Sequence, residues 1–208
     1  TNATTNCTSA ITSFTITDTH VNPTVTAATT TNNTNCTGAT PNGLLTININ
    51  GAGPVAGQFT IEWFDGNGTT TPLAAANVTG AAGETAQNLD AGTYTVRVTD
   101  LVTPNNGCAT TTTFTITDTP AVVTIDNADI ALTSQSNCSP VNGSATVNEI
   151  TVNGAGIGNT TGYTFTWYES NGTTVITGSG TAATISVALA AGTYFVKATN
   201  TTTNCASQ

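Results

Sequence analysis

Apolar and polar residues alternate in short stretches along the whole chain, and this alternation predicts β-strands. Residues 59–63 read Phe-Thr-Ile-Glu-Trp and residues 163–167 read Tyr-Thr-Phe-Thr-Trp. A period of two places one face of a strand in a core and the other face in water. Residues 45–49, 94–98, 114–116 and 194–198 repeat the pattern. Because the chain has no helical pattern of useful length, we predict an all-β fold.

The strand pattern occurs twice in the same order. Residues 89–100, around Gly-Thr-Tyr-Thr-Val, have a counterpart at residues 189–200, around Gly-Thr-Tyr-Phe-Val. Cysteines mark the period: Cys7 and Cys108 are 101 positions apart, and Cys108 and Cys205 are 97 positions apart. Such a period is typical of tandem small domains. We therefore assign residues 21–119 to a first repeat, residues 120–208 to a second that lacks its last strand, and residues 1–20 to the last strand of a preceding or neighbouring module.

Each repeat carries the aromatic residues that immunoglobulin-like domains place in fixed positions. Trp63 and Trp167 end the aromatic strands and are the expected core tryptophans. Tyr94 and Tyr194 follow Gly-Thr and are candidates for the corner tyrosine of such sandwiches. Asn-Gly pairs supply turns between strands. The prediction is two immunoglobulin-like β-sandwiches in tandem, of about seven strands each.

The second repeat differs from the first in one early strand. Its apolar phase switches between Val147 and Ile150. A one-residue insertion in a strand is normally absorbed by a β-bulge. We expect a bulge near Asn148–Glu149.

Low charge narrows the classes of partner. Two basic residues against eleven acidic ones give a formal net charge of −9. Affinity for nucleic acid comes from neutralised phosphates, and affinity for anionic membranes comes from basic clusters, so neither partner is expected. No apolar run approaches the roughly 20 residues needed to cross a bilayer, so no membrane insertion is expected in this segment.

The phase of the five cysteines suggests how they pair. Cys36 and Cys138 come just before the Asn-Gly strand of each repeat, and Cys108 and Cys205 come after the Gly-Thr-Tyr strand. We expect one bond in each repeat, Cys36 with Cys108 and Cys138 with Cys205, and for Cys7 a partner upstream. Buried free thiols are the alternative. Disulfide bonds would place the protein outside the cell.

Candidate catalytic and metal sites are sparse. His20 is the single histidine and lies in the linker before the first repeat. Glu62 aligns with Thr166 and Asp90 aligns with Ala190 in the two repeats, so no carboxylate pair recurs. We expect no enzyme activity, no cofactor and no metal cluster. Calcium at the repeat junctions is the metal worth weighing, but the aspartates there, Asp18, Asp118, Asp126 and Asp129, form no dense acidic loop.

The order Cys, Asn-Gly, strand, Gly-rich loop, aromatic-x-x-x-Trp and Leu-x-x-Gly-Thr-Tyr-x-Val resembles the SprB-type repeat of Bacteroidota surface adhesins. Residues 89–100 and 189–200 carry the resemblance, which covers nearly the whole chain in two copies. The Pro-Pro-Tyr of that family is absent, and Asn204 stands where the family has a glycine. The resemblance implies a secreted, non-catalytic cell-surface filament or adhesin stalk.

Two functions from different classes therefore compete. The first is a structural role, with modules strung head to tail into an extracellular filament at the cell surface. The second is a glycan- or protein-binding module, which would use the loops at 51–57 and 154–162. Exposed aromatics would then recognise the ligand, and Phe64, Tyr168 and Phe195 are the candidates.

The first residues repeat the strand that closes the first repeat. Residues 13–19 read Ser-Phe-Thr-Ile-Thr-Asp-Thr, and residues 113–119 read Thr-Phe-Thr-Ile-Thr-Asp-Thr. Cys7, Phe14 and Ile16 are thus expected to connect modules, with residues 11–19 as an ordered strand. Either the modules are neighbouring sections of one long polypeptide, or separate subunits donate this strand as in donor-strand fibres. The similarity of residues 1–10 to residues 199–208 favours the continuous chain, because a donated strand would bring Cys7 to the site of Cys205.

Overall fold

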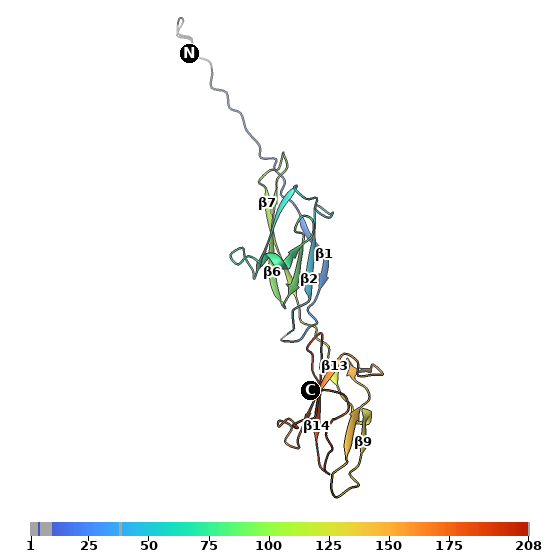
Figure 1. Ribbon diagram of the computed structural model, residues 1–208. Helices are drawn as coiled ribbons and strands as arrows, with labels where there is room; N and C mark the ends of the chain where they lie inside the picture. The colour runs from blue at the N-terminus through green and yellow to red at the C-terminus, as the bar shows by residue number, and fades with distance from the viewer. Residues whose placement is uncertain (1–3, 5–9, 38, 208) are drawn as a thin grey trace.

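The structure is a computed structural model that describes residue 4, residues 10–37 and residues 39–207. Its strands form two units, unit one (residues 21–119) and unit two (residues 120–207), which lie end to end (Figure 1). Each unit has its own hydrophobic core. No helix in the described part of the chain has the length and apolar character that crossing a membrane requires.

Unit one is an immunoglobulin-like β-sandwich. The first sheet has the order β1-β2-β5-β4 and the second has the order β3-β6-β7, with antiparallel neighbours throughout. This is the strand order of constant-type immunoglobulin domains. The strands are β1 (Val25–Thr31), β2 (Gly43–Ile49), β3 (Phe59–Asp65), β4 (Val78–Thr79), β5 (Thr85–Leu89), β6 (Gly92–Asp100) and β7 (Ala109–Ile116). A 3-10 turn, η1 (Ala75–Asn77), precedes β4.

The core of unit one lies between its two sheets. The alternating residues of β2 and β6 point inward, and Leu45, Val96 and Val98 are fully buried. Trp63 is 3% exposed, and its indole Nε1 donates to the carbonyl oxygen of Gly83 at 2.9 Å. Tyr94 donates its hydroxyl hydrogen to the carbonyl oxygen of Asp90, four residues upstream, at 2.9 Å. This bond is the tyrosine corner that ties the chain before β6.

Unit two repeats the central part of this sandwich in shorter strands. The strands are β8 (Val123–Thr124), β9 (Ile130–Thr133), β10 (Ser144–Val147), β11 (Thr151–Val152), β12 (Ala155–Gly156), β13 (Tyr163–Tyr168) and β14 (Phe195–Asn200), and a 3-10 turn, η2 (Asn127–Asp129), precedes β9. Trp167 faces Val196 across β13 and β14, as Trp63 faces Val96 across β3 and β6. Trp167 is 2% exposed, and the Tyr194 hydroxyl donates to the carbonyl oxygen of Ala190 at 3.1 Å.

The strand expected to carry a bulge is interrupted between β10 and β11. Val147 and Ile150 are 1% and 0% exposed, although they are three positions apart. In a regular strand, residues three apart point to opposite faces. Residues 148–150 therefore leave the ladder so that both side chains enter the core.

The units differ at the edge beside β14. In unit one, β7 pairs with β6 along eight residues, from Ala109 opposite Thr99 to Ile116 opposite Gly92. In unit two, the described chain supplies only the beginning of that strand, where Ala206 bridges Thr199 and Ser207 bridges Val123. The rest of the edge of β14 is open within the described residues.

Candidate functional site

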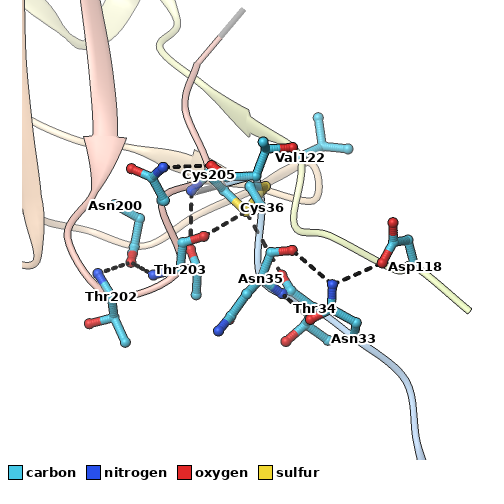
Figure 2. The surroundings of a disulfide bond; sticks show 12 residues. Asn33, Thr34, Asn35, Cys36, Asp118, Val122, Asn200, Thr202, Thr203 and Cys205 are labelled. Carbon is cyan, nitrogen blue, oxygen red and sulfur yellow. Dashed lines mark hydrogen bonds between the residues drawn. A yellow bond between two sulfur atoms is a disulfide. The ribbon is translucent and has the colours of Figure 1, made fainter. Parts of the chain in front are cut away.

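The two units are joined by a disulfide bond as well as by the chain. β7 ends at Ile116, and β8 begins at Val123, so only six residues separate the units. Cys36 of unit one bonds to Cys205 of unit two, with an S–S distance of 2.05 Å (Figure 2). Cys205 is 1% exposed, and Cys36 packs against the core of unit two. The two units are thus joined at two places, by the linker and by the disulfide.

Hydrogen bonds flank the disulfide. The Cys36 N–H donates to the carbonyl oxygen of Thr203 at 2.8 Å, and the Asn204 side chain donates to the carbonyl oxygen of Thr37 at 2.7 Å. Asn204 has a φ of 57°, and its counterpart Gly107 has a φ of 88°. Asparagine tolerates the left-handed region better than most residues. Asn204 therefore keeps the turn that glycine makes in unit one and adds a contact across the junction.

Asn33 connects the linker to the end of unit one. Its N–H donates to the carbonyl oxygen of Thr117 at 3.0 Å, and its carbonyl oxygen accepts from the N–H of Thr119 at 2.8 Å. Its side-chain amide also donates to Asp118 Oδ1 at 2.9 Å. Asn33 is only 5% exposed. These bonds hold residues 117–119 against unit one and set the direction in which the chain enters unit two.

The observed disulfide replaces the expected pairing, which was wrong. Cys36 follows β1 at the end of unit one that faces unit two. Cys108 precedes β7, and the eight residues of β7 span roughly 26 Å at the usual rise per residue. Cys36 and Cys108 therefore lie at opposite ends of one sandwich. Cysteines at equivalent positions in each repeat can form bonds from one unit to the next as well as bonds within each unit.

Of the cysteines that the structure describes, Cys108 and Cys138 have free thiols. Cys108 is half-buried and Cys138 is exposed. Cys138 corresponds to Cys36 and Cys108 corresponds to Cys205, so each free thiol occupies the position of a junction cysteine where the described residues place no neighbouring unit. Cys7 lies outside the described residues.

The loop before Cys138 has the same internal support as the loop before Cys36. Asn142 Oδ1 accepts from the N–H of Ser136 at 2.9 Å, and its amide donates to the Ser136 hydroxyl at 2.9 Å. In unit one, Asn42 makes the same two contacts with Thr34, each at 2.7 Å. The sequence signal for both is the Asn-Gly pair, which by itself predicted only a turn.

A groove with both polar and apolar lining lies in unit two between residues 132–135 and residues 189–194, just before β14. Its lining includes Leu132, Gly143, Leu189, Gly192 and Tyr194, and its volume is about 290 Å³. A second hollow of about 240 Å³ shares Leu132, Leu189 and Tyr194 and reaches Trp167. Leu132 is 74% exposed.

In unit one, Ile116 fills the corresponding space. A Cβ atom added to Gly43 would lie 2.9 Å from Ile116 Cγ2, and Ile116 is 1% exposed. At Gly143, the nearest atoms to such a Cβ are backbone atoms of Leu189, Thr133 and Gln135. The groove is therefore the place of a strand end that unit one has and the described part of unit two lacks.

Residues 10–24 run from the end of unit one that lies away from unit two (Figure 1). They were expected to contain an ordered strand, but no strand is assigned before Val25 in this described segment. Ile11, Phe14 and Ile16 are 101%, 85% and 86% exposed. A strand needs a partner to bond with, and the described chain places none beside these residues.

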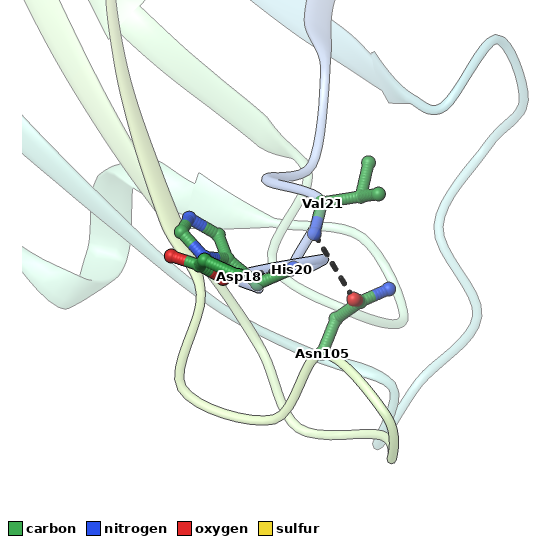
Figure 3. A network of polar contacts seen from close by, with 4 residues as sticks. All are labelled: Asp18, His20, Val21 and Asn105. Carbon is green, nitrogen blue, oxygen red and sulfur yellow. Dashed lines mark hydrogen bonds and ion pairs between the residues drawn. The ribbon is translucent and has the colours of Figure 1, made fainter. Parts of the chain in front are cut away.

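Two polar contacts order the end of this segment. His20 Nδ1 lies 2.5 Å from Asp18 Oδ1, and the N–H of Val21 donates to Asn105 Oδ1 at 3.1 Å (Figure 3). The bond from the His20 N–H, followed by the bond from its ring, lowers the pKa of the Asp18 carboxyl. His20 thus contacts a neighbouring carboxylate in the linker. No cluster of three or more potential metal ligands occurs in the described ranges.

The candidate ligand-binding aromatics do not form a shared exposed surface. Phe64 lies on the outer face of β3, as expected, but it is 4% exposed, so its expected exposure was wrong. Its ring is covered by the Arg97 guanidinium, 5.6 Å from the ring centroid, and Arg97 also pairs with Glu62. Tyr168 is half-buried, and Phe195 is 49% exposed. The sequence pattern missed Phe64 because the outer face of β3 is covered locally.

Comparison with known proteins adds little. No protein-family model matches the chain, and no curated protein matches it. Among solved structures, one similar chain contains three N-terminal domains of the bacteriophage RB49 Highly Immunogenic Outer Capsid protein (Hoc). The identity is 20% and the TM-score is 0.39, over 88% of this chain and 56% of that chain. This chain therefore spans about half of that structure, and the fold assignment rests on the strand order.

Proposed function

We propose that this chain is a non-catalytic structural segment of an extracellular filament or cell-surface stalk, built from immunoglobulin-like modules joined head to tail. The observation that carries the proposal is the junction between the units. There the closing strand of one module continues through six residues into the next module, and the Cys36–Cys205 bond closes the opposite side. Two connections at one junction resist bending better than a single flexible linker.

The dimensions suit a thread. A module whose strands have eight to nine residues, as β6 and β7 do, adds about 3–4 nm of length once its end loops are included. Length then increases with the number of modules. An abundance of hydroxyl and amide groups with 6% charged residues leaves a surface that needs no charged partner.

Localisation and partners follow from the same proposal. A disulfide at a structural junction is typical of proteins outside the reducing cytosol. The partners would be further modules of the same kind, at the cell surface, and the resemblance to SprB-type repeats supports a place in an adhesin stalk.

Electron microscopy of the native assembly tests this function. Antibodies raised against residues 25–116 should label threads along their length, with beads about 3–4 nm apart. Antibody absorbed with the purified chain is the control and should leave the threads bare. Label confined to the cell interior, or to dispersed single molecules, would overturn the proposal.

A further inference from the structure

We propose that residues 12–19 of a second copy of this chain dock in the groove of unit two, and that Cys138 of the first copy bonds to Cys108 of the second. The proposal rests on the filament function and names the partner at the free ends. Each contact it requires already occurs once inside the chain, at the junction between the units.

The exposed segment has the sequence of the strand that the groove lacks. Residues 14–19 and residues 114–119 are both Phe-Thr-Ile-Thr-Asp-Thr. In β7, the side chains of Phe114 and Ile116 point toward the core, and those of Thr113 and Thr115 point away from it. Phe14 and Ile16 carry the same two apolar groups, in the same spacing, and both are in solvent.

The register of β7 fixes where the incoming side chains would lie. Phe114 faces Tyr94, and Ile116 faces Gly92. By the same register, Phe14 would cover Tyr194, which is half-buried while its counterpart Tyr94 is 6% exposed. Ile16 would then enter the hollow over Gly143 and Leu189. The groove and the hollow beside it thus lie where the incoming strand has its apolar residues.

The backbone beyond the groove is also ready to accept a strand. In unit one, Asn33 bonds through its N–H and carbonyl oxygen to Thr117 and Thr119. Gln135 is its counterpart in unit two, and among the described residues it makes no backbone–backbone hydrogen bond. Its side chain is fixed by Ala191 and Asn137, at 2.6 and 2.7 Å. Thr17 and Thr19 of a second copy would supply the two missing partners.

The incoming chain then reaches its own unit one by a connection like the internal one. In the internal junction, Val122 exchanges hydrogen bonds with Asn153, six residues after Ile116. In unit one, Thr24 makes the same exchange with Asn50, eight residues after Ile16. The connection between copies is longer by two residues and leads to the same point of the next sandwich.

This placement brings the two free thiols together. Inside the chain, Cys36, which follows β1 of unit one, bonds to Cys205, which follows β14 of unit two. Between copies, these positions belong to Cys138 and Cys108. Two thiols lose two protons and two electrons when the S–S bond forms. A small-molecule disulfide such as oxidised glutathione accepts these protons and electrons: its own S–S bond breaks and two glutathione thiols leave, so the exchange balances.

The chain cannot satisfy its own groove in this way. Residues 10–24 leave the end of unit one that lies away from unit two (Figure 1), whereas the groove lies in unit two. The docked segment does not overlap the end of unit two, because residue 12 corresponds to residue 112, whereas Ala206 corresponds to Ala109. A second copy therefore meets an empty edge, an available backbone and a free thiol.

Light scattering on the purified chain tests the strand. The wild type should form concentration-dependent oligomers, and Phe14→Ser with Ile16→Ser should raise the concentration needed for assembly by roughly 100-fold or more, since two buried apolar side chains are lost. Both side chains are exposed in the single chain, so its fold should be unchanged. Ile11→Ser is the matched control: Ile11 is exposed, lies outside the docked residues 12–19, and should leave assembly intact.

Mixing two cysteine variants tests the direction of the junction. In a Cys7→Ser background, Cys108→Ser alone and Cys138→Ser alone should give no covalent oligomers under oxidised glutathione. An equal mixture should give a covalent dimer and nothing larger, because one thiol remains at each matching end. The unmixed chain with both cysteines should give a ladder in steps of 20.8 kDa that collapses on reduction.

Two results would overturn the proposal. The first is a wild-type chain that stays monomeric at every concentration; the strand that fills the groove would then come from a continuation of the same polypeptide, and the filament function would stand. The second is covalent dimerisation of the Cys108→Ser variant by itself, which would show that Cys138 of one copy bonds to Cys138 of another.

Discussion

Replacing both junction cysteines, Cys36→Ser with Cys205→Ser, should strongly destabilise unit two, because the disulfide restricts the unfolded chain of that unit. If unit two unfolds while unit one stays folded, the chain between the linker and Cys205 becomes a loop of about 85 residues whose ends the disulfide holds together. The chain-entropy relation gives about 4–5 kcal/mol of stabilisation for a loop of that length. That is a large share of the stability of a small domain.

Urea unfolding with fluorescence detection can measure this loss unit by unit, because each core holds one tryptophan. Trp63→Phe leaves Trp167 as the reporter of unit two. In that background, the double serine variant should lower the free energy of unfolding of unit two by about 4–5 kcal/mol. Cys108→Ser is the matched control and should leave it unchanged. A shift below about 1 kcal/mol in the double variant, or a large shift in the control, would refute the junction disulfide.

Three further changes test the packing of the units. Trp167→Ala should destabilise unit two by about 3–5 kcal/mol in urea unfolding, because the ring is buried, and a loss under 1 kcal/mol would contradict this. Tyr94→Phe should cost about 0.5–1.5 kcal/mol through the lost bond to Asp90. Burial, aided by the charges of Asp65 and Asp90, raises the pKa of Tyr94 above 10.0. The stability that the neutral hydroxyl contributes is therefore present below pH 10 and is lost as the pH rises through the raised pKa. If the Tyr94→Phe variant lost as much stability at alkaline pH as the wild type, this assignment would be wrong. Gly43→Ala should lower the free energy of unfolding of unit one by about 1–3 kcal/mol, because its Cβ would lie 2.4 Å from the Leu89 carbonyl oxygen. Gly53→Ala has open space around the added Cβ and should be nearly neutral when both variants are compared by thermal unfolding.

Strand periodicity was sufficient to predict the fold because inward positions in a sandwich must be apolar. Ile47, Val96 and Val98 alternate with polar neighbours, and they occupy the core between the sheets. The Gly-Thr-Tyr segment predicted the corner that the Tyr94 hydroxyl makes with Asp90. These features depend on neighbours in sequence or on the two faces of one strand, so a single sequence contains them.

Contacts between units could not be read in the same way. The positions of the cysteines within the repeats are compatible both with a bond inside each unit and with a bond across the junction. Only the strand order, which puts the loop after β1 and the loop after β6 at opposite ends, separates the two. The burial of Phe64 was missed for a related reason: its cover comes from Arg97 on the neighbouring strand.

Mass mapping of the unreduced chain tests the end-to-end junction most directly. Arg97 and Lys197 are the two basic residues, so trypsin yields peptides 1–97, 98–197 and 198–208 after the free thiols have been blocked and the chain denatured. Cys36–Cys205 predicts that peptide 1–97 is linked to peptide 198–208, with peptide 98–197 separate in the single chain and linked to copies of itself in the assembled filament. Peptide 1–97 found linked to peptide 98–197, with peptide 198–208 released unlinked, would contradict the account.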